Sequence, residues 1–262
     1  MATIRPPAVA GMFYPAEPDT LRRQVDEYIA AARRERPVPK AIIAPHAGYV
    51  YSGPVAGTAY AAVAPLKGLV SRVVLLGPAH RVYVRGLAAS SADAFRTPLG
   101  DVPLDHAAID ALMEDFDFVH RYDSAHAPEH SLEVHLPFLQ EALGSFTLVP
   151  LVVGDASPSE VDRVLESAWG GAETLIVISS DLSHYHDYDT AYAMDRAASR
   201  AIEQLDPAGL SQEHACGRIP VCGLLSAARR HGLSAHTVDL RNSGDTAGPK
   251  DRVVGYGAYL FY

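Results

Sequence analysis

The stretch Ala41-Ile42-Ile43-Ala44-Pro45-His46-Ala47-Gly48-Tyr49-Val50-Tyr51-Ser52-Gly53-Pro54-Val55-Ala56 decides the fold of this 262-residue chain. Its first four residues are all apolar, which is typical of a strand buried on both faces of a sheet. Pro45 has no backbone N–H to donate, so the strand ends there and His46 lies just beyond it. Ser52 is expected to cap a following helix that has Pro54 in its first turn.

The same arrangement of a short apolar strand followed by a histidine occurs twice more. Arg72–Leu76 runs into Gly77-Pro78-Ala79-His80, and Thr174–Ile178 runs into a segment that contains Asp181 and His184. One histidine in such a position is most often a structural residue. Three such placements indicate a shared site, because the carboxyl ends of parallel strands meet at one edge of an open sheet. Three imidazoles and a carboxylate there suit metal binding or acid–base chemistry.

The rest of the chain alternates between helical and strand patterns. Residues 4–16 are expected to be irregular, residues 120–129 to form a polar loop, and residues 83–104 to hold short strands. Helices are predicted over 18–34, 105–113, 130–143, 190–205 and 220–230, and strands over 146–153, 235–242 and 253–261. Ser157 and Glu160 have the spacing of a capping box at the start of another helix. No repeat or linker divides the chain, so we expect one α/β domain over residues 1–262, a sandwich around a central, largely buried sheet.

Composition excludes several classes of protein. The formal net charge of -9 argues against a binder of nucleic acid or of acidic membranes, since both need a basic face. Two cysteines do not make the disulfide framework of a secreted domain. No segment has the character of a signal peptide or of a membrane span, so we expect a cytoplasmic protein.

Six separated motifs can be compared with known families. They are Pro45-His46-Ala47-Gly48-Tyr49, Tyr51-Ser52-Gly53-Pro54, Leu75-Leu76-Gly77-Pro78-Ala79-His80, Glu129-His130-Ser131-Leu132-Glu133, Ser180-Asp181-Leu182-Ser183-His184-Tyr185 and Cys216-Gly217-Arg218. In this order they resemble the Memo family, whose bacterial members are often called AmmeMemoRadiSam system protein B. The resemblance runs from Pro6 to Tyr262. It implies a fold similar to the class III (LigB-type) extradiol dioxygenases and a functional association with partners of that system, including a radical SAM protein.

The resemblance also implies a site. It places metal ligands at His46, His80 and Cys216, and it puts His184 at the position of a catalytic acid–base histidine with Asp181 beside it. Extradiol dioxygenases hold non-haem Fe(II) with two histidines and a carboxylate. A thiolate in the third position is a softer ligand, so the expected cofactor is Fe(II) or copper, with zinc as a further candidate.

The choice between the two cysteines also has support from the residues themselves. Cys216 lies in a turn before a helix, where Arg218 and the N–H groups of the helix start would favour the thiolate. Cys222 falls at helical spacing with Leu225, a position typical of a small buried residue.

Other polar and aromatic residues have two interpretations each. Glu129 and His130 could line a substrate pocket or orient the ligand imidazoles. Tyr49 could form a wall of that pocket or pack in the core. Glu133 and His135 are as readily explained as residues on the surface of a helix.

Two functions are therefore expected as alternatives. The first is a metal-dependent, dioxygenase-like oxidoreductase that acts on a small molecule with O₂ or a reactive oxygen species, with His184 moving the proton. The second is a non-catalytic protein that uses the ancestral pocket to bind a peptide or a small anionic ligand.

Overall fold

The computed structural model describes residues 2–32 and 38–262 and is built around a mixed β-sheet. Four parallel strands form its centre, in the order β2, β9, β3, β8. Their bounds are β2 (Ala41–Ala44), β3 (Arg72–Pro78), β8 (Thr147–Val153) and β9 (Thr174–Ser179). Nearly every residue in them is buried, as expected of continuous apolar runs between two layers of helices. The four central strands predicted from the sequence are confirmed.

Further strands extend the sheet at both edges. β12 (Val253–Phe261) runs antiparallel to β2 and also pairs with β11 (Ala235–Asn242) and β10 (His184–His186). At the opposite edge, β4 (Leu87–Ala89) joins β8 to β7 (Val119–Arg121). A separate small sheet contains β1 (Ile4–Arg5), β5 (Ala94–Thr97) and β6 (Gly100–Pro103). The segment expected to be irregular thus begins with a strand, because Ile4 and Arg5 pair with β5.

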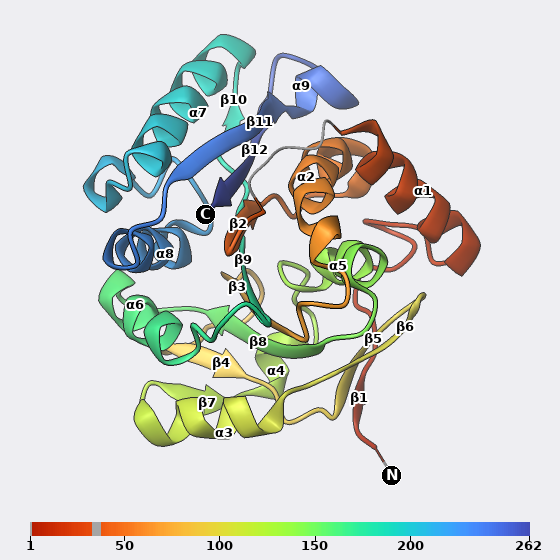
Figure 1. Cartoon of the computed structure of the whole chain (residues 1–262). Helices are drawn as coiled ribbons and strands as arrows, with labels where there is room; N and C mark the ends of the chain where they lie inside the picture. Colours follow the sequence, from red (N-terminus) through yellow and green to blue (C-terminus); the bar gives the residue numbers. More distant parts are fainter. Residues whose placement is uncertain (1, 33–37) are drawn as a thin grey trace.

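Helices cover both faces of the large sheet (Figure 1). One layer holds α6 (Pro158–Ser167), α7 (Tyr188–Glu203) and α8 (Arg218–Arg230), and the other holds α1 (Pro18–Ala31), α2 (Tyr49–Val63) and α5 (Leu136–Leu143). Shorter helices are α3 (His106–Asp115), α4 (Asp123–His126), α9 (Ser243–Thr246), η1 (Ala64–Leu66), η2 (Glu133–His135) and η3 (Pro207–Gly209). The predicted α/β sandwich is confirmed. The predicted end of the first helix, at Arg34, lies outside the described residues.

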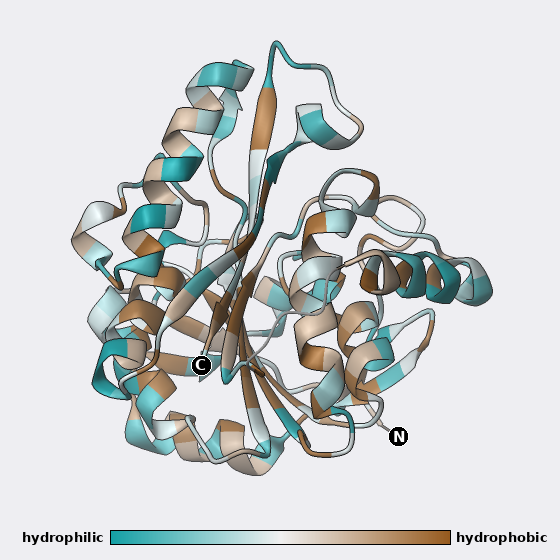
Figure 2. Ribbon diagram, turned by 45° about the horizontal axis from the view of Figure 1, so that its top comes forward, coloured by the Kyte–Doolittle hydropathy of each residue, from teal (hydrophilic) through white to brown (hydrophobic). Residues whose placement is uncertain are grey.

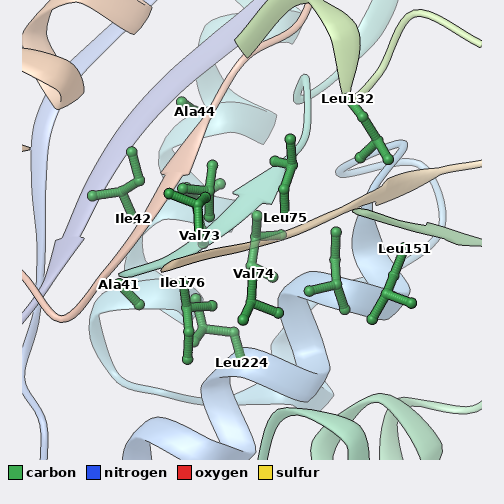
Figure 3. Packing of buried hydrophobic residues seen from close by; sticks show 14 of the residues in the cluster. Ala41, Ile42, Ala44, Val73, Val74, Leu75, Leu132, Leu151, Ile176 and Leu224 are labelled. Carbon is green, nitrogen blue, oxygen red and sulfur yellow. The ribbon is translucent and has the colours of Figure 1, made fainter. Parts of the chain in front are cut away.

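The apolar core lies between the sheet and these two layers. Figure 2 shows the central strands as the most hydrophobic part of the ribbon. In Figure 3, Val74 and Ile176 extend toward Leu224 of α8, whereas Leu132 lies on the other side of the sheet. None of the helices in the described ranges is both long and apolar enough to cross a bilayer.

The structure corrects two of the predicted helix starts. α2 begins at Tyr49 with Gly48 at its N-cap, so Pro54 lies inside the helix and Ser52 is not its cap. The Ser52 hydroxyl instead donates to the carbonyl of Ala47, 2.8 Å away. The helix predicted from His130 begins only with η2 and α5, because His130 is irregular and Ser131 and Leu132 form a turn. By contrast, the capping box of Ser157 and Glu160 is confirmed.

Candidate metal centre

Three imidazoles come together at the carboxyl edge of the parallel strands. His46 follows β2, His80 follows β3, and His130 lies in the turn before η2. One ligand nitrogen from each lies within 4.8 Å of the other two. The structure thus brings together two histidines predicted as metal ligands and one predicted to bind substrate. The alignment of β2 and β3 in one parallel sheet explains why residues 46 and 80 reach the same point.

The hydrogen bonds of His46 fix its tautomer. Its Nδ1 lies 2.6 Å from the hydroxyl oxygen of Ser179, and that hydroxyl donates its single proton to the carbonyl of Ser131 at 2.6 Å. Ser179 must therefore accept from Nδ1–H, which leaves a free lone pair on Nε2. Burial, together with the charges of His80 and His130, lowers the pKa of His46 far below its usual value. The neutral form that a metal requires is thus the stable one.

His80 is oriented in the same way by a buried carboxylate. Its Nδ1 lies 3.0 Å from Oε1 of Glu129, and its backbone N–H donates to Oε2 at 2.6 Å. Burial alone would raise the pKa of Glu129, but its contacts with His130 and His80 lower it strongly, so the carboxylate stays ionised. An ionised carboxylate only accepts, so His80 carries its proton on Nδ1 and presents the lone pair of Nε2.

Glu129 also shapes the turn that carries the third imidazole. Its Oε1 accepts from the backbone N–H groups of His130 and Ser131, both at 2.9 Å. The His130 ring stacks on the His80 ring, with centroids 4.9 Å apart. Its buried Nδ1 lies 3.3 Å from Oε1 of Glu129, although the pair does not have hydrogen-bond geometry in the described part of the chain. A third imidazole with one ring nitrogen close to the two oriented imidazoles is suited to contact a metal ion or a bound molecule.

Cys216 lies at the same centre. Its Sγ is 3.4 Å from Nε2 of His46. The expectation that Arg218 favours its thiolate is wrong, because the charge of Arg218 acts on Cys222 instead. Burial and the charge of Asp181 raise the pKa of Cys216 to about 12. Without a metal the group is therefore a thiol, and a bound metal would displace its proton. Cys222 is buried in the core, as predicted.

Asp181 and His184 lie beside the cluster, but they do not hold one another in the expected way. Oδ1 of Asp181 accepts from the backbone N–H of His46 at 2.8 Å, and Oδ2 lies 3.9 Å from Nε2 of that histidine. Burial raises the pKa of this carboxyl group. Between the described side chains of Asp181 and His184 there is no hydrogen bond. His184 is half-buried in β10, close enough for its charge to help lower the pKa of His46.

Tyr49 is a core residue in the structure. Its side chain is 2% exposed, its hydroxyl donates to the carbonyl of Val134 at 2.7 Å, and its ring lies against Phe138. Of the two interpretations that the sequence allowed for Tyr49, the structure matches packing in the core.

Glu133 has a structural role that the sequence did not indicate. Its buried carboxylate pairs with Arg5 and accepts from the backbone N–H groups of Ala8 and Val9 and from the hydroxyl of Tyr14. Arg5 in turn donates to the carbonyl of Glu129 at 2.6 Å. The N-terminal segment is thereby tied to the turn that carries Glu129. The only local signal was a charged residue beside the apolar start of a helix, and its partners lie more than a hundred positions away.

Comparisons with known proteins cover nearly the whole chain. A family model described as Memo-like protein matches residues 5–260. MEMO1 family proteins from Ignicoccus hospitalis and Aquifex aeolicus are 37% and 36% identical to the chain, over 98% of it and over 98% and 99% of their own lengths. Among solved structures, the uncharacterized protein JW3007 from Escherichia coli K12 aligns with 84% of this chain and 98% of its own, with a TM-score of 0.53 and 14% identity. That likeness is one of fold alone.

Proposed function

The chain belongs to the Memo family, and from this premise we propose that its histidine cluster holds a redox-active metal ion and serves a metal-dependent oxidoreductase. The observation that supports this most is the orientation of two imidazoles. His46 and His80 are each held through Nδ1 by an acceptor, so both present Nε2 lone pairs at one place. Such fixed outer partners are typical of histidines that ligate a metal.

We propose Cys216 as the third ligand. Sulfur and nitrogen donors bound tetrahedrally at about 2.3 Å and about 2.0 Å lie roughly 3.5 Å apart. The 3.4 Å between Sγ and Nε2 of His46 fits this spacing. The imidazole of His130, which has one ring nitrogen within 4.8 Å of the other two, would then contact the ion or a molecule bound to it.

The donor set favours iron or copper, with zinc as the alternative, since imidazole and thiolate suit all three. When bound, an iron or copper ion would supply electron transfer to O₂ or to a reactive oxygen species. The chain itself would position the substrate and handle the proton. His184 is the residue proposed to move that proton, because its half-buried imidazole lies near the cluster and an imidazole can both donate and accept a proton.

Anaerobic loading with Fe(II), Cu(I) or Zn(II), followed by removal of excess metal, tests this proposal. We expect about one ion per chain in the unaltered protein and in His236→Ala, a control that changes an exposed histidine. His46→Ala and His80→Ala should lose the ion while their circular dichroism stays unchanged. Full metal retention in both variants would refute the site.

Oxygen consumption by the loaded protein then separates catalysis from binding. With reductant and a broad panel of small molecules, the iron or copper form should consume O₂ and the zinc form should not. Stoichiometric metal without O₂ uptake would favour the non-catalytic alternative.

A further inference from the structure

A cavity of about 240 Å³ lies next to Cys216, between the carboxyl ends of β3 and β8 and the start of α8. Its lining consists of Pro78, Ala79, Val82, Tyr83, Val84, Val153, Gly154, Asp155, Cys216, Ile219 and Pro220. Cys216 is therefore shared between this cavity and the histidine cluster, where it lies 3.4 Å from His46. A molecule in the cavity would have one end beside Cys216, which is one of the proposed metal ligands.

The cavity has mostly apolar walls and a single charged group. Most of the walls are aliphatic, from residues such as Val84, Val153 and Ile219. Among the described residues that line the cavity, Asp155 alone carries a charge. Its Oδ2 accepts from the hydroxyl of Tyr83 at 3.2 Å, and Tyr83 is 73% exposed, which places this carboxylate toward the solvent side. The other carboxylate oxygen accepts no hydrogen bond from the described residues.

From this arrangement we propose that the cavity binds a small monocationic amine with an apolar body. The ammonium group pairs with Asp155, and the apolar body lies along the aliphatic walls toward Cys216. The described lining carries no cation, since Arg85 shares with Asp155 a neighbouring hollow and not this cavity. The charge of the lining is therefore negative, and the cavity disfavours the anionic ligand that the sequence left open. The apolar walls favour a hydrocarbon body through burial of its surface. A role for this amine as substrate would rest on the proposed metal centre, whereas its binding in the cavity does not.

Three probes of matched size test the proposal on metal-free protein. Benzylamine carries a positive charge, benzyl alcohol is neutral and benzoate is negative at pH 7. In nuclear magnetic resonance titrations at low ionic strength, we expect benzylamine to bind about tenfold more tightly than benzyl alcohol, and benzoate not to saturate. Equal affinities for the amine and the alcohol would overturn the proposal.

Variants locate the binding and its charge preference. Asp155→Asn should reduce benzylamine affinity to that of benzyl alcohol and leave the alcohol unchanged. Ile219→Phe and Val82→Phe, from two parts of the lining, should weaken both probes by filling the cavity. Leu69→Phe is the matched control. Leu69 is exposed and precedes the start of β3, at the end of the strand away from the cavity, so this variant should change neither affinity. A benzylamine preference that survives Asp155→Asn, or binding that survives both obstructing variants, would refute the site.

A spectroscopic titration connects the cavity to the metal. In protein loaded with Co(II), benzylamine should shift the thiolate-to-metal absorption band, because the probe lies against Cys216. An unchanged band at saturating benzylamine would overturn the placement of the apolar body beside this residue. These results remain distinct from a failure of the metal centre, because the probe affinities are measured without metal and metal content is measured without probes.

Discussion

Sγ of Cys216 lies 3.4 Å from Nε2 of His46, although 170 positions separate the two residues in the sequence. The approach depends on Gly217, where a Cβ atom would lie 2.5 Å from the carbonyl oxygen of Ser179 and 2.7 Å from Cβ of Ser180. The missing side chain lets the start of α8 come close to the end of β9. The thiol consequently reaches the imidazole that follows β2.

Replacing each cysteine in turn tests the third ligand. Cys216→Ser should weaken metal binding at least about tenfold and remove the sulfur-to-metal charge-transfer band of a Cu(II)-loaded sample. Cys222→Ser should keep the band and lose roughly 1–3 kcal/mol of stability, because it buries a hydroxyl in the core. Loss of the band only in Cys222→Ser would contradict the assignment. His130→Gln should also keep the band, because His130 is not proposed to supply the sulfur-to-metal bond.

Glu129 should matter for metal affinity more than for the fold. Glu129→Gln puts an amide group against the N–H donors of His80 and removes the charge that orients this imidazole, so metal affinity should fall about 10–100-fold. Glu133→Gln is the matched control, since it changes another buried carboxylate with four donor groups. Glu133→Gln should lower the free energy of unfolding by about 3–5 kcal/mol, because it leaves the buried guanidinium of Arg5 without its carboxylate partner. Its effect on metal affinity should be smaller than that of Glu129→Gln. Isothermal titration and urea unfolding measure the two effects, and equal affinity losses would refute the distinction.

Gly217→Ala and Gly223→Ala should distinguish close packing beside the proposed metal centre from close packing elsewhere in α8. The added methyl group meets backbone and must displace the start of α8, so both stability and metal affinity should fall. Gly223→Ala, later in α8, would place its Cβ 2.4 Å from a side-chain carbon of Val161 and should reduce stability alone, by about 1–3 kcal/mol. Metal titrations on both variants, at a temperature where each is folded, provide the comparison. Unchanged metal affinity in Gly217→Ala would show that the thiol position does not depend on this glycine.

Two buried histidines that are not among the proposed ligands should make the protein sensitive to acid. Burial lowers the pKa of His126 to about 4 and that of His135 to about 3. The unfolded chain takes up protons near pH 6.5, but the folded protein keeps both imidazoles neutral. Their contribution to stability is therefore complete above about pH 6.5 and is lost as the pH falls toward 4 for His126 and toward 3 for His135. At pH 5 the loss should be about 2 kcal/mol for each imidazole.

Urea unfolding at pH 7.5 and pH 5 checks this dependence. His126→Gln keeps a donor for the carbonyl of Ala88, which Nε2 of His126 contacts at 2.9 Å, and should show a smaller difference between the two pH values. His236→Gln, at an exposed position, should behave like the unaltered protein. An equally large difference in His126→Gln would contradict the prediction.

The central strands and part of the site could be predicted because their signals are local. Continuous apolar runs such as Ala41–Ala44 identify buried strands by themselves, and the meeting of His46 and His80 after two such runs then follows from the geometry of a parallel sheet. The capping box of Ser157 and Glu160 likewise lies within one turn of helix. These features need no knowledge of distant partners.

The rest depended on contacts that the sequence does not reveal. The burial of Glu133 comes from Arg5 and Tyr14, which lie 128 and 119 positions away. The pKa of Cys216 is raised by its burial and by the charge of Asp181, although an arginine lies two residues along the chain. In each case the environment of a charged or ionisable group is set by tertiary packing, which overrides its sequence neighbours.

The scattering of the proposed ligands along the chain also has a consequence for biosynthesis. A nascent polypeptide that has emerged only as far as His80 lacks the thiol at Cys216, so it cannot offer the complete donor set. With the proposed ligand set, complete coordination of a metal would require that α8 has been made and packed against β9. An ion acquired afterwards binds the finished structure preferentially and thereby stabilises it against unfolding. Metal occupancy in a cell would then report how many chains have completed folding.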